Sequence, residues 1–309
     1  MFTHVYDIDS IKPYNLGSVR MFKEIEYEVL TNPQFWRDLV PSLSVTDEND
    51  LGEHSQVRLC GEGFSRERLI HDGYQDFDEI VSLDVISKLR GGINELHLHN
   101  WLPVFCFLYD EYWLLLASIR DLVVQALGFE AKMMPDFWVW YVDPRKEEAG
   151  WRPHREKMYN TLLPDGMPKC MTAWIALTEA DTLSGCLYFI PAHKDDNYGK
   201  ADGRPPTLDL QNVRAVPVKA GSILLFNEGV YHWGGSSSKY AKGPRLSLAC
   251  EFQRGDISPY NKPLLELASL PSFDVRWQLV GKQVLQYKHM YHYPSGMLDL
   301  ANRMVGTVD

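Results

Sequence analysis

The chain has 309 residues and a formal net charge of −10, with 45% hydrophobic and 23% charged residues. A chain of this length and composition buries a sizeable core, which excludes wholesale disorder. The acidic balance lacks the basic surface that nucleic-acid binding requires, so we expect no nucleic-acid partner. We therefore expect a folded globular protein whose ligands are small molecules.

Thiol chemistry and membrane insertion are not indicated. The richest apolar window, 109–127, is interrupted by charged residues and predicts a buried helix rather than a membrane span. No signal peptide is recognisable, so reduced thiols and a cytoplasmic location are expected. The cysteines show no CxxC spacing and are expected to pack in the core: Cys60, Cys106, Cys170, Cys186 and Cys250.

Helical patterns dominate the first part of the chain. Helical spacing covers 22–30, Asn32-Pro33 breaks it, and 34–39 predicts a second short helix. Residues 46–54 are polar and acidic and predict a loop. This N-terminal part is expected to pack on the outside of the domain that follows.

Three more helices are predicted before the pattern changes. The first, 65–74, ends at a glycine, and the second covers 82–96. The third, 109–127, ends at Gly128, where glycine favours a left-handed cap. These helices precede every candidate site residue.

After Gly128 the periodicity changes to that of strands. Short strands separated by glycine and proline predict a sandwich or jelly roll, and helices followed by strands predict an α+β fold class. The predicted strands are 137–142, 170–178, 186–190, 213–218, 222–226 and 246–252.

The strand region is interrupted by a polar loop at 194–207, a length typical of lids and substrate-binding loops. Helical spacing returns at 263–308, where the tail either covers an open sheet edge or forms a homodimer contact. We predict a single domain over the whole chain. Its parts are an N-terminal extension (1–64), helices with a jelly-roll core (65–253) and a C-terminal helical extension (254–309).

His154 and Glu156 are separated by one residue, so in an extended backbone both side chains project from one face. His232 follows the strand 222–226, at a predicted turn, and is the natural third ligand. Two imidazoles and a carboxylate on one side of a metal leave the opposite positions open, which suits a non-heme ferrous oxygenase. The same ligands also bind zinc and activate water, so a zinc-dependent hydrolase stays open.

A series of short motifs extends over about residues 66–253. In order and spacing it resembles the phytanoyl-CoA dioxygenase-like family of iron(II)- and 2-oxoglutarate-dependent oxygenases. The motifs are Asp72-Gly73-Tyr74, His154-x-Glu156, Trp174-Ile175-Ala176-Leu177, Ser184-Gly185-Cys186-Leu187, Phe189-Ile190-Pro191-Ala192-His193, Ala220-Gly221-Ser222 leading to His232, and Arg245-x-Ser247.

The resemblance implies a double-stranded β-helix in which His154, Glu156 and His232 hold Fe(II), with 2-oxoglutarate and O2 as cosubstrates. The family usually has Asp where this chain has Glu156, so the carboxylate reaches further by about one C–C bond. Halogenating relatives keep Ala or Gly at that position, so Glu156 argues against halogenation. The resemblance also puts a turn histidine at His193, which is interpreted as structural.

Arg245 and Ser247 share a face of their predicted strand. The resemblance makes Arg245 the clamp for the distal carboxylate of 2-oxoglutarate, with Ser247 adding a hydrogen bond. A planar guanidinium pairs with a carboxylate through two parallel hydrogen bonds, which lysine does not reproduce. Trp138, Trp140 and Tyr141 precede the metal pair, and Trp138 and Tyr141 are candidates for cosubstrate contacts, with core packing as the alternative.

The expected function is oxidation of an unactivated C–H bond of a small molecule, an oxygenase reaction in specialised metabolism. Its outcome is hydroxylation, or desaturation or ring closure. Two alternatives stay open at this point. One is a zinc-dependent hydrolase with the same three ligands, and the other is a non-catalytic jelly roll that binds a small molecule.

Overall fold

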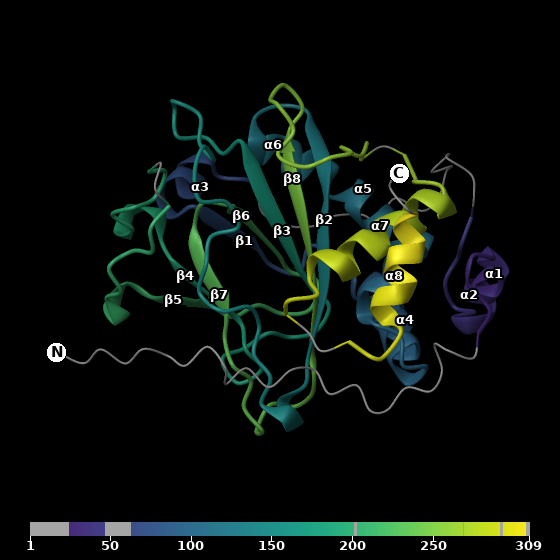
Figure 1. Cartoon of the computed structure of the whole chain (residues 1–309). Helices are drawn as coiled ribbons and strands as arrows, with labels where there is room; N and C mark the ends of the chain where they lie inside the picture. The colour runs from purple at the N-terminus through teal and green to yellow at the C-terminus, as the bar shows by residue number, and fades with distance from the viewer. Residues whose placement is uncertain (1–24, 47–62, 201–202, 268, 291–292, 307–309) are drawn as a thin grey trace.

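The computed structural model describes residues 25–46, 63–200, 203–267, 269–290 and 293–306. It consists of two facing antiparallel sheets, with helices on the outer side of the larger one (Figure 1). The larger sheet has the strand order β1-β6-β3-β8-β2 and the smaller one β5-β4-β7. This arrangement is a jelly roll with flanking helices, so the predicted α+β fold class is confirmed.

All six predicted strands are present, and two more were not predicted, β1 and β7. His232 was predicted at a turn, which is wrong, because it lies on β7. The strands are β1 (Tyr74–Phe77), β2 (Ala131–Val142), β3 (Cys170–Ala176), β4 (Leu187–Ile190), β5 (Arg214–Val216), β6 (Ile223–Asn227), β7 (Tyr231–Gly234) and β8 (Arg245–Arg254).

Helix α3 has the start and stop signals that the sequence predicts. Ser65 accepts a hydrogen bond from the backbone N–H of Arg68 at the start of α3, and Gly73 ends that helix with φ of +80°. The α-helices are α1 (Tyr27–Leu30), α2 (Pro33–Leu39), α3 (Arg66–Asp72), α4 (Leu83–Leu98), α5 (Asp110–Ser118), α6 (Arg120–Leu127), α7 (Phe273–Gln286) and α8 (Met297–Val305).

The single helix predicted over 109–127 is instead two helices, α5 and α6, that meet at Ile119. Ser118 donates its hydroxyl to the Leu115 carbonyl at 2.6 Å, which competes with the helical backbone bonds at this point. A 3-10 helix, η3 (Pro103–Leu108), precedes them. The loop predicted at 46–54 lies outside the described residues except for Thr46, as does the start of the helix predicted at 22–30.

The larger sheet is buried on both faces. Along β6, Ile223 and Leu225 pack in the core formed with the helices, whereas Leu224 and Phe226 pack in the core between the two sheets. Because successive side chains point to opposite faces, one strand serves both cores. The site described below lies on the inner side, between the sheets.

The C-terminal tail covers the edge of the larger sheet, one of the two roles predicted for it; the homodimer contact stays a prediction. Helix α7 lies beside the edge strand β2 (Figure 1). There the Gln283 side chain accepts from the Phe137 N–H at 3.1 Å and donates to the Pro135 carbonyl at 2.8 Å. These backbone groups flank the irregularity of β2 between Met133 and Phe137. A side chain of the tail therefore satisfies an otherwise open strand edge.

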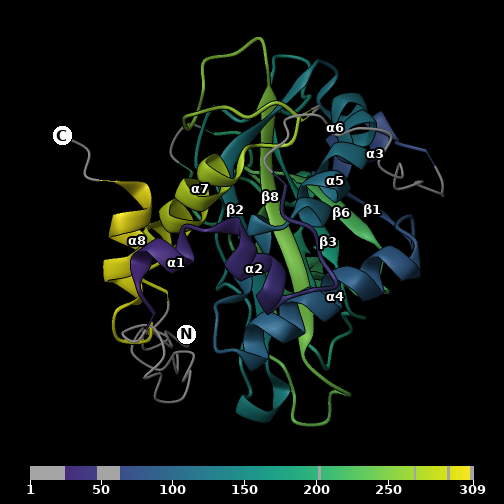
Figure 2. The ribbon, with the colours of Figure 1, turned by 90° about the vertical axis from the view of Figure 1, so that its right-hand side faces the viewer.

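The two ends of the described chain meet on the helical side. The Tyr27 hydroxyl of α1 donates to the Arg303 carbonyl of α8 at 2.9 Å, and the two helices lie side by side in Figure 2. Arg276 of α7 reaches the Asp110 carboxylate at 2.6 Å, and both side chains are buried. Among the described residues, no helix is long and apolar enough to cross a membrane.

Candidate active site

The site begins with a backbone pairing. The segment 149–154 pairs with 232–236 through isolated bridges, and His154 and His232 exchange two backbone hydrogen bonds, each 3.0 Å long. In such a pair the two residues lie directly opposite each other. Residues 78 positions apart in sequence are thereby held side by side.

Glycine makes this pairing close. A Cβ atom on Gly150 would lie 2.6 Å from the Gly234 Cα and 3.0 Å from Nη2 of Arg245. Any larger residue at position 150 would push the segment away from β7 and from Arg245. The close approach therefore places the guanidinium beside the strand that carries His232.

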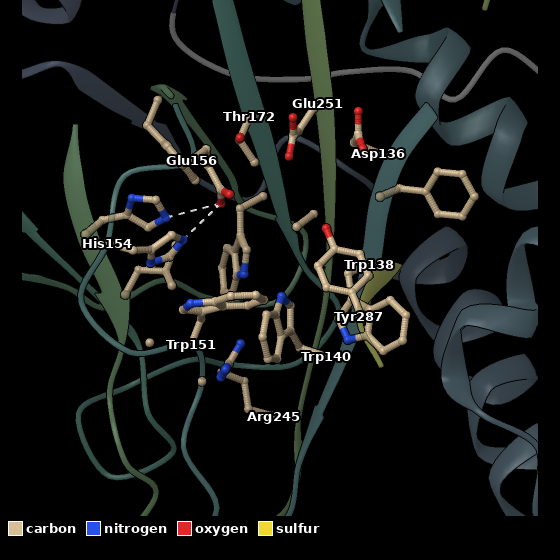
Figure 3. A pocket seen from close by; sticks show the side chains of 18 residues that line it. Asp136, Trp138, Trp140, Trp151, His154, Glu156, Thr172, Arg245, Glu251 and Tyr287 are labelled. Atoms are coloured by element: carbon tan, nitrogen blue, oxygen red, sulfur yellow. Dashed lines mark ion pairs between the residues drawn. The ribbon is translucent and has the colours of Figure 1, made fainter. Parts of the chain in front are cut away.

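The side chains of His154, Glu156 and His232 converge in the pocket (Figure 3). Oε1 of Glu156 lies 3.3 Å from Nε2 of His154 and 3.6 Å from Nε2 of His232. One donor atom from each residue lies within 4.8 Å of the others. The structure thus brings together the three residues that the sequence analysis nominated as metal ligands.

Both imidazoles are oriented by main-chain carbonyls. Nδ1 of His154 lies 2.7 Å from the Arg152 carbonyl, and Nδ1 of His232 lies 3.1 Å from the Val230 carbonyl. Since a carbonyl only accepts, each Nδ1 carries the proton and each Nε2 presents a lone pair to the centre of the group. This is the tautomer that metal-binding histidines need.

The pKa shifts of Glu156 and His232 agree with this geometry, whereas that of His154 is in the opposite direction. Burial would raise the pKa of Glu156, but His154 and His232 hold it well below its ordinary value. Burial lowers the pKa of His232, and the neighbouring His154 lowers it further. Burial also works to lower the pKa of His154, but Glu156 outweighs it and leaves this pKa raised. An ionised carboxylate beside a neutral imidazole is what a metal ligand set requires.

The spacing of the donor atoms suits a single ion. Ligands about 2.1 Å from a metal and at right angles to each other are about 3 Å apart. The separations of 3.3 and 3.6 Å are slightly longer, so small side-chain rotations would complete the coordination. Two imidazoles and one carboxylate on one side leave the remaining positions of an octahedral ion open. The residues present therefore fit a ferrous ion, and they fit zinc as well.

Arg245 opens the strand β8, and its side chain lines the same pocket. It is only 1% exposed, and its Nη1 donates to the Ser247 hydroxyl at 2.8 Å. The guanidinium carbon also lies 5.6 Å from the ring centre of Trp174. The neighbouring hydroxyl and indole hold the guanidinium in one orientation, as a carboxylate-binding side chain requires. Its role as the clamp stays a prediction.

The two nominated aromatic residues of β2 have different positions. Trp138 lines the pocket together with Trp140. Tyr141 projects from the other face of the strand, where it stacks on His97 with ring centres 4.4 Å apart, and it is not a lining residue. Alternation along a strand gives residues 138 and 140 one face and 141 the opposite one. Tyr141 is thus a core residue on the helical side, which corrects its nomination as a cosubstrate contact.

Several lining residues were not found by the sequence analysis. The most notable are Thr172, Glu251, Asp136 and Tyr287. Glu251 follows Arg245 on β8 by six positions and shares its face, so strand alternation contains the signal. Tyr287 belongs to the tail, where nothing in the local sequence indicates a site.

A second group of potential ligands lies at the surface. His71 and His193 stack with ring centres 3.8 Å apart, and Oδ1 of Asp72 lies within 3.3 Å of Nδ1 of both. Nδ1 of His193 is also 3.2 Å from the His71 carbonyl. These contacts join the end of α3 to the turn after β4. The structural role predicted for His193 stays a prediction.

The sequence of this region matches a known protein family. The family model for phytanoyl-CoA dioxygenase (PhyH) matches residues 91–243, a segment that contains all three candidate ligands. Residues 91–243 form a segment of the phytanoyl-CoA dioxygenase (PhyH) family. This match confirms the resemblance to the family that the sequence motifs indicate.

One curated relative matches over a short segment. Phytanoyl-CoA dioxygenase 1 of Oryza sativa subsp. japonica is 31% identical over 90 residues, which cover 26% of this chain and 31% of the rice protein. The match thus spans about a third of that curated relative. At residues 91–243, the PhyH model covers a larger part of the chain than this pairwise match.

Solved structures show the same fold. The non-heme α-ketoglutarate-dependent epimerase SnoN from nogalamycin biosynthesis matches with a TM-score of 0.52 at 16% identity, covering 67% of this chain and 96% of SnoN. HygX from Streptomyces hygroscopicus, solved with nickel and 2-oxoglutarate bound, matches with a TM-score of 0.48 at 13% identity, covering 64% and 90%. The SnoN match establishes the shared jelly-roll architecture.

Proposed function

We propose that the protein is an iron(II)- and 2-oxoglutarate-dependent oxygenase that oxidises an unactivated C–H bond of a small molecule. The observation that carries this proposal is the convergence of two correctly oriented imidazoles and one carboxylate beside a buried arginine. The PhyH family match and the fold shared with the α-ketoglutarate-dependent epimerase SnoN support it. Specialised metabolism is the proposed setting.

In this proposal His154, Glu156 and His232 hold the ferrous ion from one side. When bound with 2-oxoglutarate and O2, that ion supplies the oxidation, while the cosubstrate is converted to succinate and carbon dioxide. Arg245, oriented by Ser247, binds the distal carboxylate of 2-oxoglutarate through paired hydrogen bonds. Trp138 and Trp140 wall the cavity, exclude water and orient the prime substrate.

In this proposal Glu156 is a metal ligand and has no role in proton transfer. Glu156 is held ionised by its two histidine neighbours, so it acts as a permanent ligand and not as a proton carrier. Hydroxylation, desaturation and ring closure all begin with the same hydrogen removal, and they differ in how the substrate is held afterwards. The pocket walls therefore determine the outcome.

The test is anaerobic reconstitution of the metal-free protein with ferrous iron, followed by 2-oxoglutarate. We expect weak visible charge-transfer absorbance on addition of the cosubstrate, and succinate formation once oxygen is admitted. His232→Ala should abolish both signals, while the matched variant His99→Ala, at an exposed position, should retain them. Absence of the absorbance in the wild-type protein would refute the proposal.

The same preparation distinguishes the zinc-dependent hydrolase, which the ligand set alone also permits. Reconstitution with zinc in place of iron should leave the protein without activity toward esters and amides. Hydrolysis by the zinc form, together with no response to 2-oxoglutarate, would identify the hydrolase instead. The buried Arg245 beside the metal ligands favours the oxygenase, because water activation by zinc does not call for it.

A further inference from the structure

The pocket has two chemically different ends. Along β8, Arg245, Ser247, Ala249 and Glu251 project from the same face, and the register pairs Glu251 with Thr172 of β3. Six residues of strand span about 20 Å. In Figure 3, Arg245 accordingly lies at one end of the cavity, while Glu251, Thr172 and Asp136 lie at the other.

Carboxyl groups at this far end outnumber the cationic side chains that contact them among the described residues. Nζ of Lys157 lies 2.8 Å from Glu251 and 2.7 Å from Glu228, so one ammonium serves two carboxylates. Its bond to Glu251 uses Oε2, and Oε1 accepts no hydrogen bond from the described residues. Burial raises the pKa of Glu251, and the nearby Glu228 carboxylate raises it further, as an incompletely balanced site would.

Asp136 adds a second carboxylate that is held by neutral groups. Asn261 donates to both of its oxygens at 2.7 and 2.8 Å, and Gln286 donates to Oδ1 at 2.8 Å. Within the described part of the chain, no cationic side chain lies in salt-bridge range of it. Lys282 donates instead to the Asn261 amide oxygen at 3.1 Å and to the Lys262 carbonyl at 3.0 Å. The amides fix the position of the Asp136 carboxylate without neutralising it.

A third polar group at this end has no hydrogen-bond partner among the described residues. The Thr172 side chain lines the pocket and is 1% exposed, and its hydroxyl makes no hydrogen bond within the described residues. A buried hydroxyl without a partner is costly unless a ligand completes it. Thr172 therefore indicates that the far end is built to receive a polar group.

Aromatic rings wall the space between the two ends. Trp138 and Tyr287 have ring centres 4.6 Å apart, and Trp151 lies 6.3 Å from Trp140 and 6.0 Å from Tyr287. The negative faces of aromatic rings attract cations, and their flat surfaces bind apolar bodies. The carboxylates and the Thr172 hydroxyl can accept hydrogen bonds, and the indole rings can bind a cation or an apolar group. Together these groups favour one kind of ligand.

We propose that the prime substrate is an organic amine, bound in its protonated form with its ammonium group at Glu251, Asp136 and Thr172 and its apolar body against the aromatic wall. That the bound amine is a substrate rests on the proposed oxygenase function. The polarity of the pocket assigns the two ligands to opposite ends. The dianionic cosubstrate belongs with Arg245, and the cation belongs with the carboxylates.

Binding is tested on metal-free protein by quenching of tryptophan fluorescence, since Trp138, Trp140 and Trp151 line the pocket. The probes come in sets of three that share one apolar group and carry an amine, an alcohol or a carboxylate. The first set is 2-phenylethylamine, 2-phenylethanol and 3-phenylpropionate, and two further sets replace the phenyl group with cyclohexyl and n-hexyl. In at least one set we expect the amine to bind about tenfold more tightly than the alcohol and the acid. If no amine binds more tightly than its alcohol and acid counterparts, the inference is wrong.

Variants locate the binding site. Glu251→Gln should weaken amine binding about tenfold, and Glu95→Gln, an exposed glutamate of α4, should leave it unchanged. Because Glu251 belongs to a buried ion-pair network, Thr172→Val provides a second test that keeps the shape of the side chain. It should weaken amine binding about threefold without loss of thermal stability. Unchanged affinity in both site variants would overturn the assignment.

These measurements distinguish a failure of this inference from a failure of the proposed oxygenase function. Amine preference is measured without iron or 2-oxoglutarate, so it survives a failure of the oxygenase proposal as evidence for an amine-binding pocket. Conversely, charge-transfer absorbance with iron and 2-oxoglutarate but no amine preference would remove only the substrate class. Succinate release stimulated by an amine that binds would support both proposals.

Discussion

The candidate metal ligands are prepared by the main chain. The Arg152 and Val230 carbonyls fix the tautomers of His154 and His232, and the histidine backbones bond to each other. Main-chain groups do not depend on the identity of the side chain that they carry. Substitution of Arg152 or Val230 should therefore leave the tautomers unchanged as long as the backbone keeps its path.

Arg245→Lys tests the clamp. Lysine keeps the charge but loses the planar fork, so we expect 2-oxoglutarate to bind about tenfold more weakly while iron binding is unchanged. Anaerobic titration followed by charge-transfer absorbance measures the former, and a ferrous chelator competition measures the latter. Arg90→Lys, at an exposed position of α4, is the matched control. An equal loss of iron and cosubstrate would contradict the assignment.

Glu228 gives a prediction for pH dependence. Burial raises its pKa to about 7, despite the opposing Lys157, from an ordinary value of 4.5. Between these values the folded state binds more protons than the unfolded state, so the free energy of unfolding should fall as pH rises through this window. Glu228→Gln should remove that part of the pH dependence.

Urea unfolding at pH 5 and at pH 7.5 measures the effect. The wild-type protein should lose more stability between the two values than Glu228→Gln does, and Glu95→Gln should behave as the wild type. A steeper loss in Glu228→Gln than in the wild type would reverse the sign of the argument.

At this scale the sequence predicts part of the site. The three candidate ligands were predictable, because their spacing and the family resemblance both indicate them: His154, Glu156 and His232. The network of Lys157 with Glu228 and Glu251 was not, since Lys157 and Glu251 are separated by 94 positions and only the sheet register brings them together. Tyr141 lies next to Trp140 on β2, so strand alternation turns its side chain to the opposite face, toward His97.

At the scale of elements, ends with a chemical signal were predictable, whereas strands β1 and β7 were not. The cap at Ser65 and the left-handed Gly73 mark α3 in the sequence. Strands β1 and β7 have four residues each, and each closely follows another element, α3 and β6 respectively, from which the local pattern does not separate it. They exist because β6 and β4 offer them partners, and that information lies elsewhere in the chain.

Gln283→Ala tests how the tail completes the edge of the sheet. The substitution leaves the Phe137 N–H and the Pro135 carbonyl buried without this partner, so we expect a loss of about 1–3 kcal/mol in the free energy of unfolding. Gln278→Ala removes the same side chain from an exposed position of the same helix and should change stability by less than about 0.5 kcal/mol. Urea denaturation compares the two, and equal effects would argue against the edge contact.

At the scale of the whole molecule, the tail is part of the core. Arg276 donates to the Leu108 carbonyl at 2.8 Å and to the Asp110 carboxylate, which tethers α7 to the start of α5. The fold class was predictable, because helical and strand periodicities are local properties. The packing of both faces of the larger sheet was not predictable, because an apolar strand sequence does not indicate which elements cover its two faces.

Arg276→Met isolates this tether. It leaves Asp110 as a buried charge without its guanidinium, so we expect destabilisation by about 3–5 kcal/mol. The double variant Arg276→Met, Asp110→Asn removes both charges and should recover a large part of that loss. Thermal and urea unfolding measure both proteins. A double variant that is less stable than Arg276→Met would show that charge pairing is not the source of the effect.

Tyr287 directly follows the last turn of α7 and also forms part of the pocket wall. Docking of this helix and occupancy of the cavity are therefore linked equilibria, in which each event favours the other. A molecule resting on the phenol ring would slow amide hydrogen exchange throughout α7, far from its own contacts. Transient release of the helix would, in turn, give a bound product a way out of the protein.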